Sequence, residues 1–304
     1  MLTKFTALAM GVLLSVSAMA ADMATADMAT LTRQAQSGGA VAQSDLADEY
    51  YQQGNHAKAF EWYTKAAQQG HALAQHNLGM MYKNGEGVRQ DHQKAVQWYT
   101  KAAQQGEAAA QSKLGVMYAE GEGVRQDHHK AFEWFTKAAG QGDAAAQYGL
   151  GWMYENGHGV RQDHHKAFEW FTKAAHQGLA VAQSNLGVMY AKGLGVRQDY
   201  QKAAEWFTKA AGQGDAAAQG ILGVMYYEGL GVRQDYQKAV EWYTKAAQQG
   251  DGDVAAQGIL GVIYDRGLGV RQNKSTAKHY FGQACDQGDQ SGCDDYRELN
   301  EQGY

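Results

Sequence analysis

The sequence predicts an all-α protein, an α/α solenoid in which helix hairpins of about 36 residues stack side by side. Six tryptophans recur every 36 residues, each within a near copy of the phrase KAxEWYTKAAQQG. Five leucines repeat with the same spacing, and each is followed at once by Gly. Two different landmarks with one period indicate a repeat array rather than one globular core. The landmarks are Trp62, Trp98, Trp134, Trp170, Trp206 and Trp242, and Leu78, Leu114, Leu150, Leu186 and Leu222.

The chain begins with the features of an export signal. Residues 1–20 place Lys4 ahead of a short apolar stretch and end in the small-x-small triplet Ala18-Met19-Ala20, so we expect cleavage after Ala20. An uncleaved membrane anchor is the alternative, but the apolar run is shorter than the ~20 residues that span a bilayer. We therefore expect a mature chain without a membrane span, either periplasmic or secreted. Residues 21–30 spell ADMAT twice and are expected to form a flexible lead-in.

Charge argues against one class of partner. The formal net charge of the 304 residues is -5, and removal of Lys4 with the leader makes it more negative. A protein that binds a phosphate backbone needs clustered Lys and Arg. Nucleic acid is therefore not an expected partner.

The pattern within one repeat predicts two helices. The second helix has an apolar stripe at i, i+3, i+4, i+7 and i+8, begins near Asp91, whose carboxylate can cap it, and stops at Gly106. The first helix ends at Gly85 and carries Gly79, which allows a neighbouring helix to approach closely. The two stripes are Ala95, Trp98, Tyr99, Ala102 and Ala103 in the second helix, and Ala74, Leu78, Met81 and Tyr82 in the first.

A Gly-x-Gly-Val-Arg-Gln loop joins the two helices of each regular repeat. Its glycines permit left-handed backbone conformations, and its Val can pack back onto the hairpin. The loop occurs at 85–90, 121–126, 157–162, 193–198, 229–234 and 267–272.

These landmarks divide residues 31–304 into a short first repeat, six regular repeats and a terminal half-repeat that caps the array. The first repeat is short, because Leu46 and Trp62 are only 16 residues apart, whereas Leu78 and Trp98 are 20 apart. In a later repeat Asp251 and Gly252 lengthen the turn after Gly250. The expected units are a first repeat near 40–70, repeats at 71–106, 107–142, 143–178, 179–214, 215–250 and 251–288, and a cap at 289–304.

The recurring pattern resembles the Sel1-like repeat family, a relative of the tetratricopeptide repeats. The resemblance covers roughly residues 31–303, although many family members have Pro where this chain has Arg. It implies a right-handed superhelix whose concave groove is lined by the first helices. It also implies a protein-binding scaffold, and exported bacterial members act in envelope assembly, regulation or host contact. The departing residues are Arg89, Arg125, Arg161, Arg197, Arg233 and Arg271.

One tryptophan breaks the register. Trp152 stands in a first helix where other repeats have Met or Val, one helical turn after Tyr148. By the same resemblance this position faces the groove, where an aromatic pair is a common binding anchor; alternatively, Trp152 fills a gap between helices. The predicted groove residues are His76, Met80, Lys83, Tyr148, Trp152, Glu155, Asn156, Lys192, Tyr227, Glu228, Asp265 and Arg266, together with Asn84, Ser112, Glu120 and Ser184.

The repeated charges are expected to be structural. An Asp follows each loop Arg by two residues, where a carboxylate is favoured by the helix dipole and free backbone donors. A ladder for anionic ligands is the alternative. Histidines at the starts of second helices, such as His92 and His128, should be too far apart to bind one metal ion, since packed helices lie 8–10 Å apart. We expect an exposed polar face there and no metal.

Cys285 and Cys293 lie in the terminal unit, and their positions resemble those in the cysteine-rich subset of the family, where such pairs form a disulfide between two helices. Export is compatible with oxidation, and two free thiols are the alternative. Some cysteine-rich relatives are described as binding penicillins, which makes a weak β-lactam or peptidoglycan-directed hydrolase the alternative function. One Ser-x-x-Lys match exists, at Ser275 and Lys278, but no companion motif accompanies it. We therefore expect no catalysis and no cofactor.

Overall fold

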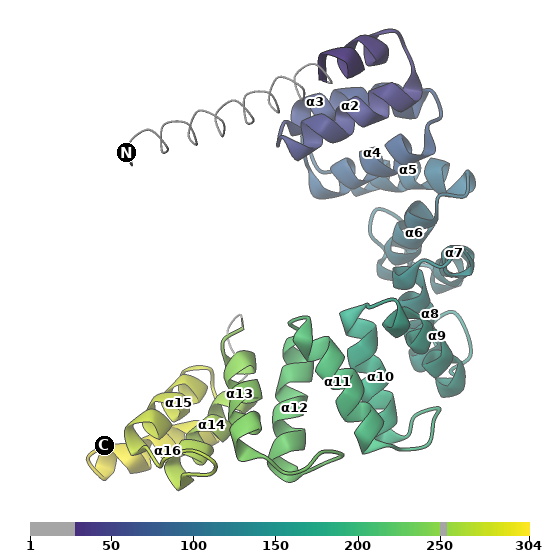
Figure 1. The fold of residues 1–304 in the computed structure, drawn as a ribbon. Coiled ribbons are helices and arrows are strands. Elements are labelled where there is room, and N and C mark those ends of the chain that lie inside the picture. The colour runs from purple at the N-terminus through teal and green to yellow at the C-terminus, as the bar shows by residue number, and fades with distance from the viewer. Residues whose placement is uncertain (1–27, 250–253) are drawn as a thin grey trace, which may run out of the picture. The chain divides into compact units, whose positions relative to one another are not determined.

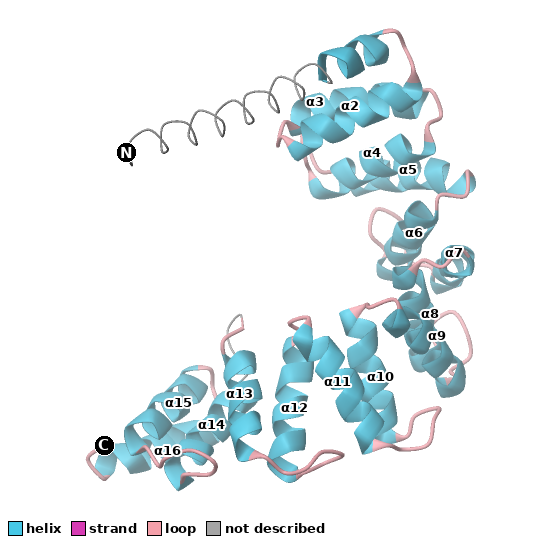
Figure 2. Ribbon diagram, viewed as in Figure 1, coloured by secondary structure: helices cyan, strands magenta, loops and turns pink. Residues whose placement is uncertain are grey.

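The computed structural model describes residues 28–249 and 254–304, and these residues form helices and no strands (Figure 2). The predicted signal peptide lies outside the described residues, and a helix across 28–36 begins within the predicted lead-in. The helices that follow are α2 Ala40–Gln52, α3 His56–Gln68, α4 Ala72–Asn84, α5 His92–Gln104, α6 Ala108–Glu120, α7 His128–Gly140, α8 Ala144–Asn156, α9 His164–His176, α10 Ala180–Lys192, α11 Tyr200–Gly212, α12 Ala216–Glu228, α13 Tyr236–Ala247, α14 Val254–Arg266, α15 Lys274–Asp286 and α16 Gln290–Glu301.

The chain divides into two compact units, Met1–Asp143 and Ala144–Tyr304. In the first unit α2 packs on α3, α4 on α5 and α6 on α7; in the second, each of α8, α10, α12 and α14 packs on the helix that follows it. Figure 1 labels these hairpins along the chain. Successive hairpins within a unit also pack on one another, for example through α3 with α4 and through α11 with α12. The prediction of an all-α, α/α solenoid architecture is confirmed.

The helix boundaries follow the predicted chemistry. The Asp91 carboxylate accepts a hydrogen bond from the Lys94 backbone N–H at 2.9 Å, which satisfies one of the free donors at the start of α5. Gly85 ends α4 in the left-handed conformation, with a φ of 77°. The same cap recurs at Asp127, Asp163, Asp199 and Asp235. The repeated carboxylates therefore have the structural role that their position favours.

The buried aromatic residue of each second helix is the one after the tryptophan. Tyr99 is 1% exposed, whereas Trp98 is only half-buried and packs against the cluster of α2, α3 and α4. The Lys101 ammonium lies 3.9 Å from the centre of the Trp98 ring and covers it. The expectation that the tryptophans belong to the buried stripe is therefore corrected. Their rings lie at its edge, between the interior and a cationic side chain, and the buried positions are Tyr63, Tyr99, Phe135, Phe171, Phe207 and Tyr243.

From α5 onward each buried ring is pressed against a glycine of the partner helix, whereas Tyr63 of α3 packs in one cluster with Ala47 of α2. A Cβ on Gly79 would lie 2.9 Å from the Tyr99 ring, and one on Gly151 would lie 2.6 Å from the Phe171 ring. Real Cβ atoms do not approach a ring this closely. The glycine after each landmark leucine is therefore required by close helix approach, as the sequence predicts.

The loops join consecutive repeats through their second glycine. Gly87 has a φ of 67°, and a Cβ there would lie 2.2 Å from the carbonyl oxygen of His56 at the start of α3. Val88 packs against the same buried cluster as Leu78, as predicted. The loop of one repeat thus rests on the second helix of the preceding one, a contact that no side chain at position 87 would allow.

A ladder of buried glutamines, which the sequence analysis did not identify, also connects the repeats. The Gln183 amide donates to the Ala175 carbonyl oxygen at 3.1 Å, and its own side-chain oxygen accepts from Gln213 at 2.8 Å. Because buried amides are costly unless they are hydrogen-bonded, this pairing fixes the register of successive hairpins. Its buried members are Gln43, Gln75, Gln111, Gln147, Gln183, Gln219 and Gln257.

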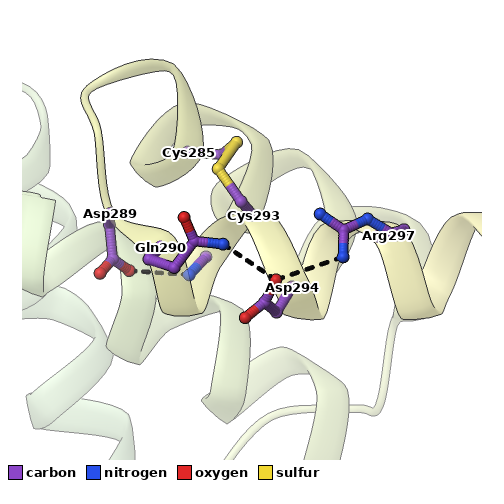
Figure 3. The surroundings of a disulfide bond; sticks show 7 residues. Cys285, Asp289, Gln290, Cys293, Asp294 and Arg297 are labelled. Carbon is purple, nitrogen blue, oxygen red and sulfur yellow. Dashed lines mark hydrogen bonds and ion pairs between the residues drawn. A yellow bond between two sulfur atoms is a disulfide. The ribbon is translucent and has the colours of Figure 1, made fainter.

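Cys285 in α15 and Cys293 in α16 form a disulfide, with their Cα atoms 4.5 Å apart (Figure 3). It joins the last complete hairpin to the single helix that follows. On the chain-entropy model, a loop this short stabilises the fold by about 2–3 kcal/mol. This covalent link supports the end of the array, where no later repeat packs against α16 among the described residues.

We predict that Gly151→Ala destabilises the protein by about 1–3 kcal/mol, because the added methyl group would overlap the Phe171 ring. Thermal and urea unfolding followed by circular dichroism would measure the change. Gly212→Ala is the matched control, since Gly212 is also helical and a Cβ there meets nothing within 4 Å. Its effect should be at most about 1 kcal/mol, toward greater stability. Equal effects of both substitutions would contradict the proposed packing constraint.

Candidate partner-binding surface

The predicted groove residues all lie on first helices. We call the surface that they form the first-helix surface. It comprises the residues predicted above to line a groove, on α4, α6, α8, α10, α12 and α14. Two of them are corrected by the structure, because Ser112 and Ser184 are only 4% and 7% exposed. Both hydroxyl side chains are buried, so they offer little accessible surface.

In the first unit these residues mostly contact other parts of the array. His76 is half-buried, with its ring 5.5 Å from the Tyr99 ring, and Met80 packs against the buried cluster of the next repeat. Lys83 pairs with Glu122 of the next loop at 3.0 Å. Glu122 also lies 3.1 Å from His92 Nδ1. Lys83 is therefore paired with Glu122, and Glu122 also lies beside His92. Neither Glu122 nor His92 was predicted to belong to this surface.

In the second unit Tyr148 and Trp152 are brought together on α8, and both side chains are half-buried. The Tyr148 ring lies 5.5 Å from the Phe171 ring, and burial raises the pKa of its hydroxyl. Trp152 packs against the cluster of Phe171 and Met189, with its ring 4.7 Å from that of His158. Packing on one side holds both rings in place, and part of each ring remains accessible.

The charged and polar neighbours of this pair come from the end of α8 and from α10. Burial raises the pKa of the Glu155 carboxyl, and the positive charges of His164 and Lys192 oppose that shift. Asn156 donates to the Trp152 carbonyl oxygen at 2.9 Å, which ties the last turn of α8 together. Lys192 is exposed. The aromatic pair is thus bordered by one partly buried carboxylate and one accessible ammonium group.

Further along the second unit several apolar side chains are accessible among charged ones such as Glu228 and Arg233. Tyr227 lies edge-on to Tyr236, with ring centres 5.3 Å apart. Tyr200 and Val224 are each 39% exposed and Leu230 is 37% exposed. The sequence pattern predicts Tyr227 at this surface but not Tyr200, Tyr236 or Leu230. A signal was present, because the loop residue between the two glycines changes from Glu86 and Glu122 to Leu194, Leu230 and Leu268.

The remaining predicted residues have separate surroundings. Asp265 pairs with Lys274 at 2.7 Å, whereas Glu228 and Arg266 are exposed. Asn84 and Glu120 are also exposed, at the ends of α4 and α6. The structure therefore does not gather all the predicted residues into one site; within the second unit it brings together Tyr148, Trp152 and Glu155 on α8.

The residues suggested for catalysis are not arranged as a nucleophile and its base. Ser275 is exposed at the start of α15. The Lys278 ammonium donates to the Asn300 side-chain oxygen at 2.8 Å and to the Tyr304 carbonyl oxygen. A lysine that activates a serine must be hydrogen-bonded to it or close by. Lys278 is instead engaged with the last residues of the chain.

Within residues 28–249 and 254–304 no three His, Cys, Asp or Glu residues are grouped so that they could hold a metal ion. The helices in those ranges are too short or too polar to cross a bilayer.

The comparisons with known proteins agree with this architecture. The Sel1 repeat model matches seven consecutive segments, at residues 40–71, 72–107, 108–143, 144–179, 180–215, 216–251 and 254–289. The chain belongs to the Sel1 repeat family. Sel1 repeat proteins are generally scaffolds for protein–protein interaction and are typically not catalytic.

Two solved structures are similar to this Sel1 repeat protein over most of its length. One is a protective antigen of uropathogenic Escherichia coli, with 39% identity and a TM-score of 0.85 over 91% of this chain. The present chain spans 60% of that antigen's length. The other is a Sel1 repeat protein from Oxalobacter formigenes, with 31% identity and a TM-score of 0.70, covering 80% of this chain and 96% of the other. Comparison with curated proteins gives no match.

We predict that His76→Ser makes thermal stability less sensitive to acid. Burial lowers the pKa of His76 below its usual 6.5; the negative charge of Glu107 opposes this shift, and the positive charge of Lys113 adds to it. The unfolded chain therefore takes up this proton at a higher pH than the folded chain, and stability is lost as the pH falls through and below about 6.5. Melting temperatures measured between about pH 7 and pH 5 should fall less steeply in the variant.

Serine occupies the same position in three other repeats, at Ser44, Ser112 and Ser184, so the fold accommodates the substitution. His129→Gln, at an exposed position on α7, is the control. If the two variants and the unchanged protein show the same pH slope, His76 does not make this contribution.

Proposed function

We propose that this protein is an exported scaffold that binds a protein partner on the first-helix surface of its second unit, centred on Tyr148 and Trp152. The observation that carries the proposal is the paired aromatic rings of α8. They are fixed from beneath by Phe171 and by the cluster around it, yet they remain partly accessible. Rigid aromatic side chains of this kind dominate the affinity of many protein interfaces, because they lose little conformational freedom on binding.

The internal repeats support a binding role for these two residues. Where α8 has Tyr148 and Trp152, α6 has Ser112 and Val116, and α10 has Ser184 and Val188. The small residues suffice to build the same hairpin, so the aromatic pair is not required by the fold. Tyr200, Val224 and Leu230 are further accessible apolar side chains in the same unit.

Three observations support export. The leader motif ends at Ala20, and Cys285 is paired with Cys293, as expected for an oxidising compartment. The similar protein of uropathogenic Escherichia coli is a protective antigen. An antigen meets the immune system, which favours contact with host factors over a role confined to the cytoplasm. Envelope assembly and regulation are the other settings in which such a scaffold would act.

A weak β-lactam or peptidoglycan-directed hydrolase is less well supported. Ser275 lies on an exposed helix start, and Lys278 is hydrogen-bonded to Asn300 and Tyr304. Labelled penicillin should therefore leave the purified protein unmodified. Covalent labelling of Ser275 would favour the hydrolase and contradict the scaffold.

We predict that the double substitution Tyr148→Ser with Trp152→Val leaves the fold intact and weakens partner binding roughly thirtyfold or more. The partner is first identified by placing a photo-reactive amino acid at position 188, which corresponds to Trp152 in the next repeat, in the producing bacterium. Its affinity for the purified protein is then measured by calorimetry with the unchanged and the substituted chains. Unchanged melting temperatures would show that the repeats still fold.

The control is Glu241→Gln, on the exposed face of the second helix α13. It should leave the affinity unchanged. If the double variant melts normally and binds the partner as tightly as the unchanged protein does, the assignment of this surface is wrong.

We also predict that the protein recovered from the envelope or the medium begins at Ala21, which N-terminal sequencing or mass spectrometry of the intact chain would establish. Recovery of the full-length chain from the cytoplasm would contradict export.

A further inference from the structure

The first helices share a packing position that we call the cross-repeat slot. It holds His76 in α4, Tyr148 in α8, serine in α2, α6 and α10, and glycine in α12 and α14. Of the two glycines, Gly220 of α12 is buried and Gly258 of α14 is only partly buried. The residue in the slot meets two positions of the following repeat. His76 interacts electrostatically with Glu107 and Lys113, and Tyr148 is hydrogen-bonded to the Asn185 side chain. In these two repeats a side chain therefore fills the slot and lies near polar groups of the next first helix or its N-cap.

The slot of the last complete hairpin has no side chain to fill it. At Gly258 a Cβ would have only the Asp289 Oδ2 nearby, at 3.7 Å, which is an ordinary contact distance. A hollow of about 510 Å³ opens there between α14, α15 and α16. Its size is within the range of sites that bind part of a ligand or a partner side chain.

The lining of the hollow combines an apolar floor with an acidic rim. Ile259, Val262 and Phe281 provide the floor, and Asp289 and Asp295 stand on the α16 side. These two carboxylates occupy the positions that Glu107 and Lys113 hold beside His76. The slot at Gly258 thus keeps the polar partners of the recurring arrangement but lacks the residue that they would contact.

The charges around the hollow are unbalanced. Asp289 Oδ2 accepts from the Gly292 backbone N–H at 2.8 Å, and Asp295 has a raised pKa because of burial and then of the negative charges of Glu298, Asp265, Asp289 and Asp294. Lys274 is already paired with Asp265, and Arg297 with Asp294. Within the described ranges no ion pair joins a cation to either rim carboxylate of the hollow.

A smaller hollow of about 100 Å³ adjoins the first and shares Val262, Phe281 and Asp295 with it. Arg266, Lys274, Asp265 and Glu298 line it as well. Its two cations face three carboxylates, so negative charge predominates across both hollows.

We propose that the slot at Gly258 binds one lysine or arginine side chain of a protein partner, with the methylene stem on the apolar floor and the cationic head between Asp289 and Asp295. Lysine and arginine combine an apolar stem with a charged end, which matches this division of the lining. A hydrogen bond between two charged groups is stronger than a neutral one, and a partly desolvated carboxylate gains most from a cation. The inference rests on the proposed function and names one recognition element of the partner.

The test uses defined peptides and the mature protein, so that its outcome is independent of identifying the natural partner. Acetyl-Ala-Ala-Arg-Ala-Ala-amide and its Lys counterpart are titrated into isotope-labelled protein, and backbone amide signals are followed by NMR. We expect saturable shifts of the Gly258, Ser291 and Gly292 signals, with dissociation constants of ~1 mM, as for a single side-chain contact. The same peptide with Gln in place of Arg should leave these signals unchanged.

Two variants use residues that the chain itself has at equivalent positions. Gly258→Tyr fills the slot as Tyr148 does in α8, and it should abolish the shifts. Asp295→Asn reproduces Asn185 and should weaken binding of the Arg peptide roughly threefold to tenfold. Asp294→Asn is the matched control, because it removes the same charge from the residue just before Asp295. The Asp294 carboxylate accepts a hydrogen bond from Gln290 and pairs with Arg297 (Figure 3). It should bind the Arg peptide as the unchanged protein does.

Several outcomes would overturn the proposal. One is an equal response to the Gln peptide. Another is no response to the Arg or Lys peptide at ~10 mM, a concentration about ten times the expected dissociation constant. A third is full binding by a Gly258→Tyr protein whose melting temperature is unchanged. Shifts of the same signals on changing protein concentration alone would assign the hollow to a second copy of the chain. Loss of peptide binding with intact partner affinity would remove this inference and leave the proposed function standing.

Discussion

The close contact between an aromatic ring and a glycine backbone is the constraint on which the rest of the structure depends. In each regular repeat the second helix presses its buried Tyr or Phe against a glycine of the first helix, at a distance that leaves no room for a Cβ, as at Gly151 and Phe171. That contact sets the spacing within a hairpin, and the second loop glycine and the buried glutamines then set the spacing between hairpins. A tightly packed interior tolerates little change in volume, so these positions recur almost unaltered.

Because the interior is so restricted, variation between repeats is confined to the surface. The position of Lys83 in the first unit is occupied by Tyr227 in the second, and the loop residue Glu122 corresponds to Leu230. In the first unit these residues form ion pairs with one another, whereas in the second they leave aromatic and aliphatic side chains accessible. Paired surface charges contribute little to binding, and accessible apolar surface contributes more. The repeats are thus alike as packing units and different as recognition units.

Tyr148 of α8 and Gly258, which lines the hollow of α14, occupy the same position of the repeat. Tyr148 fills the cross-repeat slot of its own repeat and adds surface above it, whereas Gly258 leaves the equivalent slot open between two carboxylates. One structural position thus provides either an apolar anchor or a receptor for a cationic side chain. A scaffold built in this way can contact an extended partner at several points, each determined by one residue of a first helix.

The sequence alone determined the helical architecture, the repeat period, the capping carboxylates and the glycines at close approaches, because these follow from local periodicity and backbone sterics that recur in every repeat. It also identified the departures from the repeat at Tyr148 and Trp152, since a break in a regular pattern is visible without a structure. Tertiary structure alone decided which residues are accessible. Ser112 is covered and Tyr200 is exposed, the tryptophans lie beside the buried stripe, and Gly258 leaves a hollow. Exposure depends on how one hairpin covers the next, and those contacts join residues about 30 positions apart.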